Sequence, residues 1–181
     1  DPAYDKAGSM ISGPKPGAET TEHCYQYDAW NRLRRVFTDA DSDDTFDTGE
    51  TIHQESQYDG LNRRIVRIAG SGSTWLRTDL YFNDAAPALR SLGVAGWQII
   101  EEKVSATQTS FANAAAASTT TQYQYVWDLR YIDSPVLRDE DLDSDGDCTD
   151  DEGTGSERLC YANDANFNVT ALVETDGSVA E

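Results

Sequence analysis

The sequence YDAWNRL at residues 27–33 returns as YDGLNRRI at residues 58–65, and this recurrence decides the fold. An earlier copy, YDKAGSM, begins at Tyr4, and two degenerate copies begin at Tyr125 and Tyr161. The common form is Tyr-Asp, two spacers, Gly or Asn, and then an apolar run, which is typical of a turn followed by a β-strand. Because self-similarity at short intervals indicates a repeat architecture, we interpret the chain as an array of β-hairpins.

The spacing of the copies becomes more even when acidic segments are treated as insertions. Tyr4 and Tyr27 lie 23 residues apart, whereas Tyr27 and Tyr58 lie 31 apart, or 19 without the twelve residues 39–50. A second acidic segment, residues 139–152, separates the two degenerate copies in the same way. Both segments are therefore predicted to be loops between strands.

The length of 181 residues suits one domain, so we expect a single all-β unit over residues 1–181. Within it, residues 12–21 carry two prolines and resemble an extended linker. Residues 84–96 and 105–121 break the repeat pattern and are predicted to be irregular, the second being a Ser/Thr/Ala-rich, low-complexity and mobile stretch. The array is expected to form a curved sheet or the wall of a tube or shell, with acidic loops at hairpin ends.

The net charge of −19 is concentrated in the two acidic segments. Residues 39–50 contain six acidic residues and residues 139–152 contain nine, with no Lys or Arg in either, so the rest of the chain holds 18 acidic and 14 basic residues. Nucleic-acid binding requires a basic face and is not expected. No run approaches 18 apolar residues, and no membrane insertion is expected.

The acidic segments match the twelve-residue calcium loop, which supplies oxygen ligands from positions 1, 3, 5, 7, 9 and 12. The first segment supplies Asp39, Asp41, Asp43, Thr45, Asp47 and Glu50. The second supplies Asp141, Asp143, Asp145, Asp147, Thr149 and Glu152. Gly146 stands at position 6 of the second loop, where a sharp turn is needed, and Asp44 stands there in the first.

These segments resemble EF-hand calcium loops over about twelve residues each, but strand-like sequence flanks the first instead of helices. We therefore expect two Ca²⁺ ions, each held in a loop that ends a β-hairpin. The alternative is a solvated acidic turn that binds no ion. Without a cation the carboxylates of one loop repel one another, so calcium is expected to stabilise the folded state.

Little in the sequence supports catalysis, and we expect no enzyme. His23 and Cys24 are adjacent, so in a strand their side chains point to opposite faces and form no dyad. The three cysteines lack zinc-site spacing; a disulfide between Cys24 and Cys160 remains open in an oxidising compartment, with Cys148 in an acidic loop. Arginines such as Arg32 are expected to pair with repeat aspartates or to cover aromatic rings.

The repeated residues 27–33, 58–65 and 163–172 resemble the YD repeats of the Rhs family. That resemblance implies a secreted or surface-displayed protein whose β-hairpins coil into a shell or tube wall. We expect a non-enzymatic structural protein of an extracellular or cell-surface assembly, stabilised by calcium and polymerising into a fibre by strand addition between copies. The alternatives are a wall segment, within a longer repeat polypeptide, of a shell that encloses and delivers a toxin, and a calcium-dependent adhesin.

Overall fold

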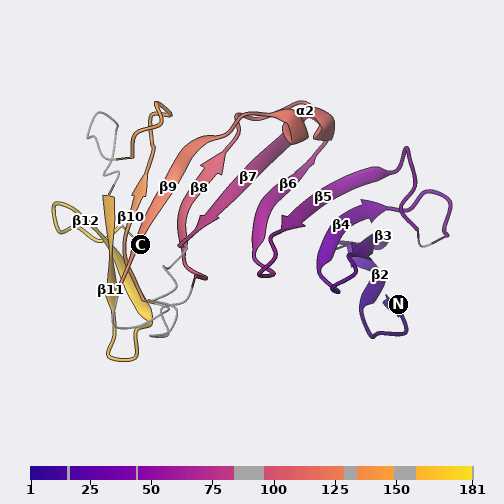
Figure 1. Cartoon of the computed structure of the whole chain (residues 1–181), viewed down its shortest axis with the longest axis horizontal. Helices are drawn as coiled ribbons and strands as arrows, with labels where there is room; N and C mark the ends of the chain where they lie inside the picture. The colour runs from indigo at the N-terminus through magenta and orange to yellow at the C-terminus, as the bar shows by residue number, and fades with distance from the viewer. Residues whose placement is uncertain (16, 44, 84–95, 129–133, 149–157, 181) are drawn as a thin grey trace. The chain divides into compact units, whose positions relative to one another are not determined.

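The chain is an antiparallel β-sheet in which each strand pairs with the next one in the sequence (Figure 1). The computed structural model describes residues 1–15, 17–43, 45–83, 96–128, 134–148 and 158–180. Twelve strands follow one another in chain order within one open sheet, and the described residues contain a single short helix. The all-β class predicted from the sequence is confirmed.

The strands are six to ten residues long, except for a two-residue first strand, and one short helix lies between β8 and β9. They are β1 (Ala3–Tyr4), β2 (Met10–Lys15), β3 (Ala18–Tyr27), β4 (Leu33–Thr38), β5 (Thr51–Tyr58), β6 (Arg64–Ser71), β7 (Thr74–Phe82), β8 (Ile99–Val104), α2 (Phe111–Ala116), β9 (Thr120–Trp127), β10 (Pro135–Glu140), β11 (Arg158–Asn163) and β12 (Val169–Glu174).

The chain divides into two compact units. Unit 1 contains residues 1–77 and 106–117, and unit 2 contains residues 78–105 and 118–181. In both units successive strands run in opposite directions, so the connections between them alternate between the two ends of the strands. The Tyr-Asp sequences therefore lie at one end of the strands that they join, and the acidic loops lie at the opposite end.

Four turns share one backbone geometry, and we call residues 5–9, 28–32, 59–63 and 164–168 the Tyr-Asp turns. In each, the amide of the Asp donates to the carbonyl of the residue four positions later, and the Asp carbonyl accepts from the residue three positions later. One Asp carboxylate oxygen also accepts two backbone N–H groups within the turn. The fourth turn residue has positive φ, which explains the Gly or Asn in the repeat. These residues are Gly8, Asn31, Asn62 and Phe167.

In unit 1 a tyrosine from each of the hairpins β3–β4 and β5–β6 reaches back to the preceding hairpin. The Tyr27 hydroxyl donates to the Met10 carbonyl (3.1 Å) and the Tyr58 hydroxyl donates to the Leu33 carbonyl (2.9 Å). Met10 directly follows the Tyr-Asp turn at residues 5–9, and Leu33 directly follows the turn at residues 28–32. The tyrosine of the motif thus fastens neighbouring hairpins, which accounts for its recurrence at this place.

In unit 2 the same position is taken by other side chains. Trp127 Nε1 donates to the Ile99 carbonyl (2.7 Å), and Asn163 Nδ2 donates to the Pro135 carbonyl (3.2 Å). The two degenerate copies were predicted to begin at Tyr125 and Tyr161. In the structure the place of the motif tyrosine belongs to Trp127 and Asn163, two residues later in each case. The predicted alignment was wrong because it followed the aromatic residue instead of the residue that precedes the turn Asp.

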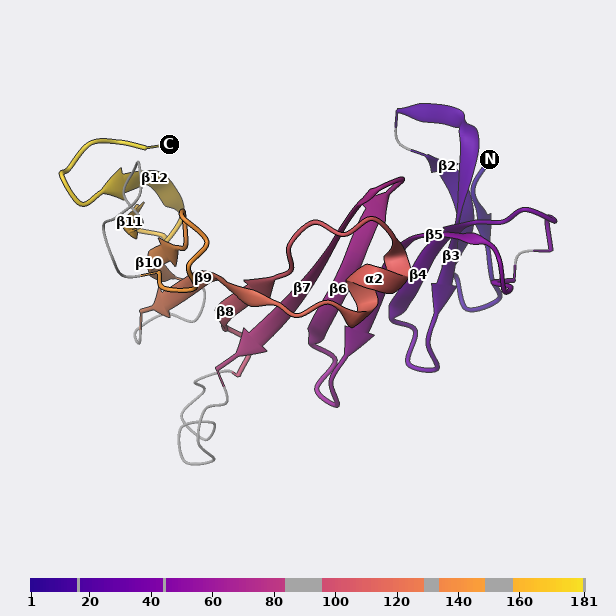
Figure 2. The same ribbon diagram turned by 90° about the horizontal axis from the view of Figure 1, so that it is seen from above.

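The helix α2 corrects the expectation that residues 105–121 are irregular. Ser110 caps α2 by accepting a hydrogen bond from the Asn113 amide (3.2 Å), and Ala114 is fully buried against Val66, Ile68 and Trp75. Both views show α2 lying against β6 (Figures 1 and 2). The alanine run is a packing surface: small side chains let the helix approach the sheet closely, which a composition-based reading cannot detect.

The structure also bears on the predicted linker at residues 12–21 and on the three cysteines. Residues 12–21 are not a linker, because β2 and β3 form an antiparallel hairpin through most of this stretch, with Ser12 opposite Cys24. Pro14 is tolerated on β2 because β1 covers only the first part of that strand. None of the three cysteines forms a disulfide, and Cys24 is buried.

Candidate metal centres in two acidic loops

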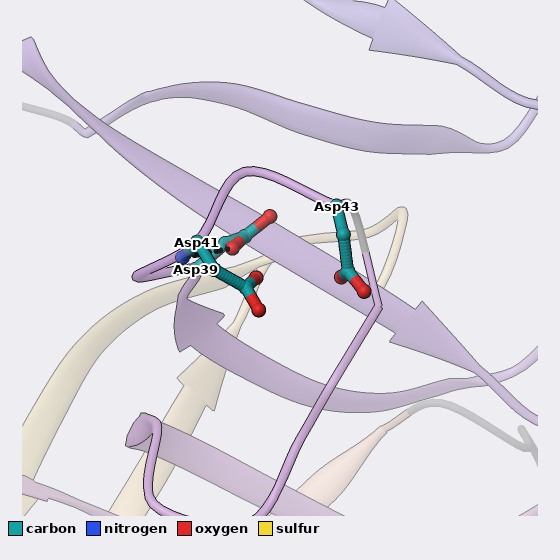
Figure 3. A group of neighbouring side chains, drawn as sticks. All are labelled: Asp39, Asp41 and Asp43. Atoms are coloured by element: carbon teal, nitrogen blue, oxygen red, sulfur yellow. Dashed lines mark hydrogen bonds between the residues drawn. The ribbon is translucent and has the colours of Figure 1, made fainter.

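The first acidic loop, residues 39–50, connects β4 to β5. Asp39 follows the last residue of β4, and Glu50 precedes the first residue of β5. Asp39, Asp41 and Asp43 each place one carboxylate oxygen within 4.8 Å of the other two (Figure 3). Oxygens that bind one calcium ion at about 2.4 Å lie at most about 4.8 Å apart, so the three carboxylates can share one ion.

Hydrogen bonds inside the loop fix its course. Asp39 Oδ1 accepts from the amides of Asp41 (3.1 Å) and Ser42 (2.7 Å), and Asp43 Oδ1 accepts from the Thr45 amide (2.8 Å). Such turns leave the second carboxylate oxygen able to face a ligand. The backbone therefore winds around its own aspartates, and Ser42 takes a positive φ of 64° to do so.

Glu50 closes the first acidic loop at its far end. Its Oε1 accepts from the Ala40 amide (3.1 Å) and its Oε2 accepts from the Asp47 amide (3.0 Å). The carboxylate predicted at position 12 thus ties together the start and the later half of the loop. Because each carboxylate oxygen has a second lone pair, these bonds do not consume the capacity of Glu50 to bind a cation.

An aromatic contact anchors the same loop to the sheet. The Phe46 ring packs edge-on against Phe37 (centroids 5.4 Å apart), and the Arg35 guanidinium lies over Phe46 at 4.5 Å. Phe37 is 1% exposed, so the loop is attached to one of the most buried side chains of unit 1. Phe46 is not among the residues predicted from the sequence, although a single large apolar residue within an acidic stretch indicates that the stretch packs against another part of the protein.

The second acidic loop, residues 141–152, follows β10. Asp141, Asp143 and Asp145 bring one carboxylate oxygen each to within 4.8 Å of the others. Asp141 is 2% exposed; its Oδ1 accepts from the Ser144 amide (2.6 Å) and its Oδ2 from the Gly146 amide (2.9 Å). Thr149 and Glu152, the ligands predicted at positions 9 and 12, lie outside the described residues.

The two acidic loops have the same local conformation at equivalent positions. The residue at position 4 has positive φ in both, 64° at Ser42 and 70° at Ser144, and its amide donates to the carboxylate at position 1. In both, the carboxylate at position 5 accepts from the amide at position 7. Gly146 at position 6 has a φ of 95°, which matches the sharp turn predicted there.

The electrostatics of the first loop favour a cation. Repulsion from Asp43, followed by burial and by the charges of Asp39 and Asp47, raises the pKa of Asp41 above its ordinary value. A bound divalent ion removes this repulsion, because it favours the ionised carboxylate. The ionised loop would therefore gain free energy from a bound cation.

One residue of the acidic stretch has a different role from its neighbours. Asp139 lies opposite Arg158 in the β10–β11 ladder, and its two oxygens accept from Arg158 Nε (2.8 Å) and Nη2 (2.7 Å). The carboxylate is almost completely buried. Asp139 therefore joins the strands below the second loop with a two-pronged ion pair, and leaves the loop to the aspartates that follow.

The structure also brings together two residues that the sequence keeps apart. The rings of His23 and His53 stack with centroids 4.6 Å apart, and His53 Nε2 lies 2.8 Å from Thr38 Oγ1. A β-bulge lies at this place: Val36 pairs with Gln54 and Phe37 with Ile52, so His53 is the extra residue of β5. Cys24, the neighbour of His23, is buried.

No helix among the described residues is long and apolar enough to cross a membrane. No protein-family model matches the chain, and a search of curated proteins finds no match.

Proposed function

We propose that this chain is a non-enzymatic structural element of a secreted or cell-surface assembly, a repeat array of Tyr-Asp hairpins braced by calcium. The single observation that carries the proposal is the recurrence of one turn geometry, with a side chain before the turn Asp that bonds a main-chain carbonyl of the preceding hairpin at four places. Because a hairpin of this kind can bond to another like it, the array can extend by adding further hairpins. This is the construction expected of a wall or a fibre.

The second part of the proposal is the calcium brace. Each acidic loop gathers three aspartate carboxylates within the span of one ion, and the two loops share a positive φ at position 4 and two hydrogen bonds from backbone amides to aspartate carboxylates. Phe46 and Glu50 connect the first loop to its sheet. Calcium bound there opposes separation of β4 from β5, so the ion stabilises the hairpin as well as the loop.

The proposed partners are further repeats of this type, in copies of the chain or in a longer polypeptide. An antiparallel edge strand presents unpaired N–H and C=O groups, and another strand can satisfy them by addition. The structural-array proposal thus covers both the fibre and the shell wall that the family resemblance implies. The two differ in whether the isolated chain polymerises.

The test is size-exclusion chromatography with light scattering, followed by negative-stain electron microscopy, in millimolar calcium and in excess chelator. The fibre form predicts ordered polymers that loosen on chelation, and the shell-wall form predicts a monomer whose unfolding midpoint falls on chelation. A variant of the first loop, Asp41→Ala, should reproduce part of the chelator effect, whereas Asp176→Asn, in a turn outside both loops, should not. A monomer whose stability ignores calcium would remove the brace from the proposal.

A further inference from the structure

The first Tyr-Asp turn lacks an ion pair that the two following turns contain. In the turns at residues 28–32 and 59–63 the second carboxylate oxygen of the Asp accepts from an arginine four positions later, Arg32 at 2.6 Å and Arg63 at 2.7 Å. In the turn at residues 5–9 this place belongs to Ser9, whose hydroxyl donates instead to Asn31 Oδ1 (2.6 Å). Within the described part of the chain, no side chain donates to the Asp5 carboxylate.

The surroundings of Arg32 define what a guanidinium meets between two turns. Besides the Asp28 carboxylate of its own turn, Arg32 donates through Nη1 to the Asp59 carbonyl (3.0 Å) and to Asn62 Oδ1 (3.0 Å) of the next turn. Its guanidinium carbon lies 4.8 Å from the centre of the Tyr58 ring. Besides the Trp30 ring at 5.1 Å, whose equivalent in the first turn is Ala7, four groups hold this cation: a carboxylate, a main-chain carbonyl, an amide oxygen and the Tyr58 ring.

The same four groups exist one repeat earlier, without an arginine between them. The equivalents of Asp28, Asp59, Asn62 and Tyr58 are Asp5, Asp28, Asn31 and Tyr27. All four line a cavity of about 490 Å³ that also touches Tyr25 and Phe46. Ser9, which holds the sequence position of the arginine, does not line this cavity; its hydroxyl is turned to Asn31.

We propose that this cavity is a guanidinium-binding site that accepts an arginine side chain of a partner protein. The Asp5 carboxylate supplies the charge, Asn31 and the Asp28 carbonyl supply acceptors, and Tyr27 supplies a ring face for the cation. Arginine fits better than lysine because its planar fork can bond several acceptors at once while lying flat on a ring. The net charge of −19 attracts basic partners over a longer range.

The experiment titrates the folded chain with argininamide and, as a neutral isostere, with citrullinamide, by calorimetry or by chemical shifts at constant ionic strength. Argininamide should saturate a single site with an affinity at least about tenfold above that of citrullinamide, since a hydrogen bond to a charged group contributes about 1.5 to 3 kcal/mol. Shifts should centre on Asp5, Tyr27 and Asn31. Equal binding of the two compounds would overturn the proposal.

Two variants examine the site from opposite sides. Asp5→Asn keeps the oxygen that accepts the turn amides but removes the charge, and should reduce argininamide affinity about tenfold or more, whereas Asp176→Asn should leave it unchanged. Ser9→Arg supplies the missing side chain from within, and should abolish argininamide binding while raising the urea midpoint. If Ser9→Arg does not fold, Asp5→Asn decides alone: unchanged affinity in that variant rejects the site. Because Phe46 and Thr45 of the first acidic loop line the cavity, the titration is run both in calcium and in chelator; absence of argininamide binding in both conditions rejects the site and leaves the structural-array proposal untouched.

Discussion

The Tyr58 hydroxyl donates a 2.9 Å hydrogen bond to the main-chain carbonyl of Leu33, which lies 25 positions earlier and belongs to the preceding hairpin. Leu33 follows its Tyr-Asp turn directly, so the bond joins the base of one turn to the strand that enters the next. The Tyr58 ring is also covered by the Arg32 guanidinium. One aromatic residue of the motif therefore makes both a polar and a stacking contact with the previous repeat.

Replacing Tyr58 by phenylalanine should lower the free energy of unfolding by about 1 kcal/mol, because it removes one hydrogen bond and leaves the ring in place. Urea denaturation at neutral pH measures the change. Tyr4→Phe is the matched control, since Tyr4 is 60% exposed and its hydroxyl has no partner among the described residues. A loss of the same size in both variants would mean that the bond to Leu33 does not hold neighbouring hairpins together.

Replacing Gly70 by alanine should be far more costly. A methyl group there would lie 2.2 Å from the Thr74 carbonyl oxygen and 2.7 Å from Trp75 Cα, which are backbone atoms that cannot move aside. The expected loss is about 2 kcal/mol or more, as for overpacking at a rigid site. Gly60→Ala serves as the control, because a Cβ at Gly60 meets nothing within 4 Å. Equal stability of the two variants would contradict the close approach of β6 and β7.

The stacked histidines should make the folded state sensitive to mild acid. Burial lowers the pKa of His53 below 6.5, and the nearby His23 and Lys15 lower it further; burial and Lys15 lower the pKa of His23. The unfolded chain then binds protons at a higher pH than the folded chain, so the free energy of unfolding falls as the pH drops below about 6.5 and levels off below the folded-state pKa.

The variant His53→Gln isolates this effect, because glutamine can still bond Thr38 but cannot take up a proton. Its stability should fall less than that of the original chain between neutral pH and about pH 5. Denaturation curves over that range in excess chelator keep the calcium loops out of the comparison. Parallel pH profiles for the two proteins would show that the stacked pair does not respond to protons.

The sequence was sufficient for features that depend on local chemistry. The Asp and Asn of residues 28–32 predict a turn because these residues accept local amides and tolerate positive φ, and the structure has that turn. The pairing of Arg32 with Asp28 was likewise predicted and is present at 2.6 Å. The strands on either side of the first acidic loop are also where the sequence placed them.

Features that depend on contacts between distant segments could not be obtained in this way. The stacking of His23 on His53 joins two strands that are not neighbours in the sheet, and the bulge at His53 interrupts the alternation from which a strand's faces are predicted. The burial of Ala114 depends on Trp75 and Ile68, which lie far away in sequence. The cavity beside Asp5 becomes visible only when the turns are compared in space, because Ser9 is unremarkable as a sequence position.

The proposed calcium brace is tested most directly by titrating the chelator-treated chain with calcium in a calorimeter, alongside Asp41→Ala and Asp143→Ala, which remove position 3 of the first and second acidic loops. Two ions should bind to the original chain and one to each variant, and the unfolding free energy should rise by about 2.7 kcal/mol when free calcium exceeds the dissociation constant of a site a hundredfold. Absence of calcium binding, or a stoichiometry that neither variant changes, would contradict the assignment of both loops.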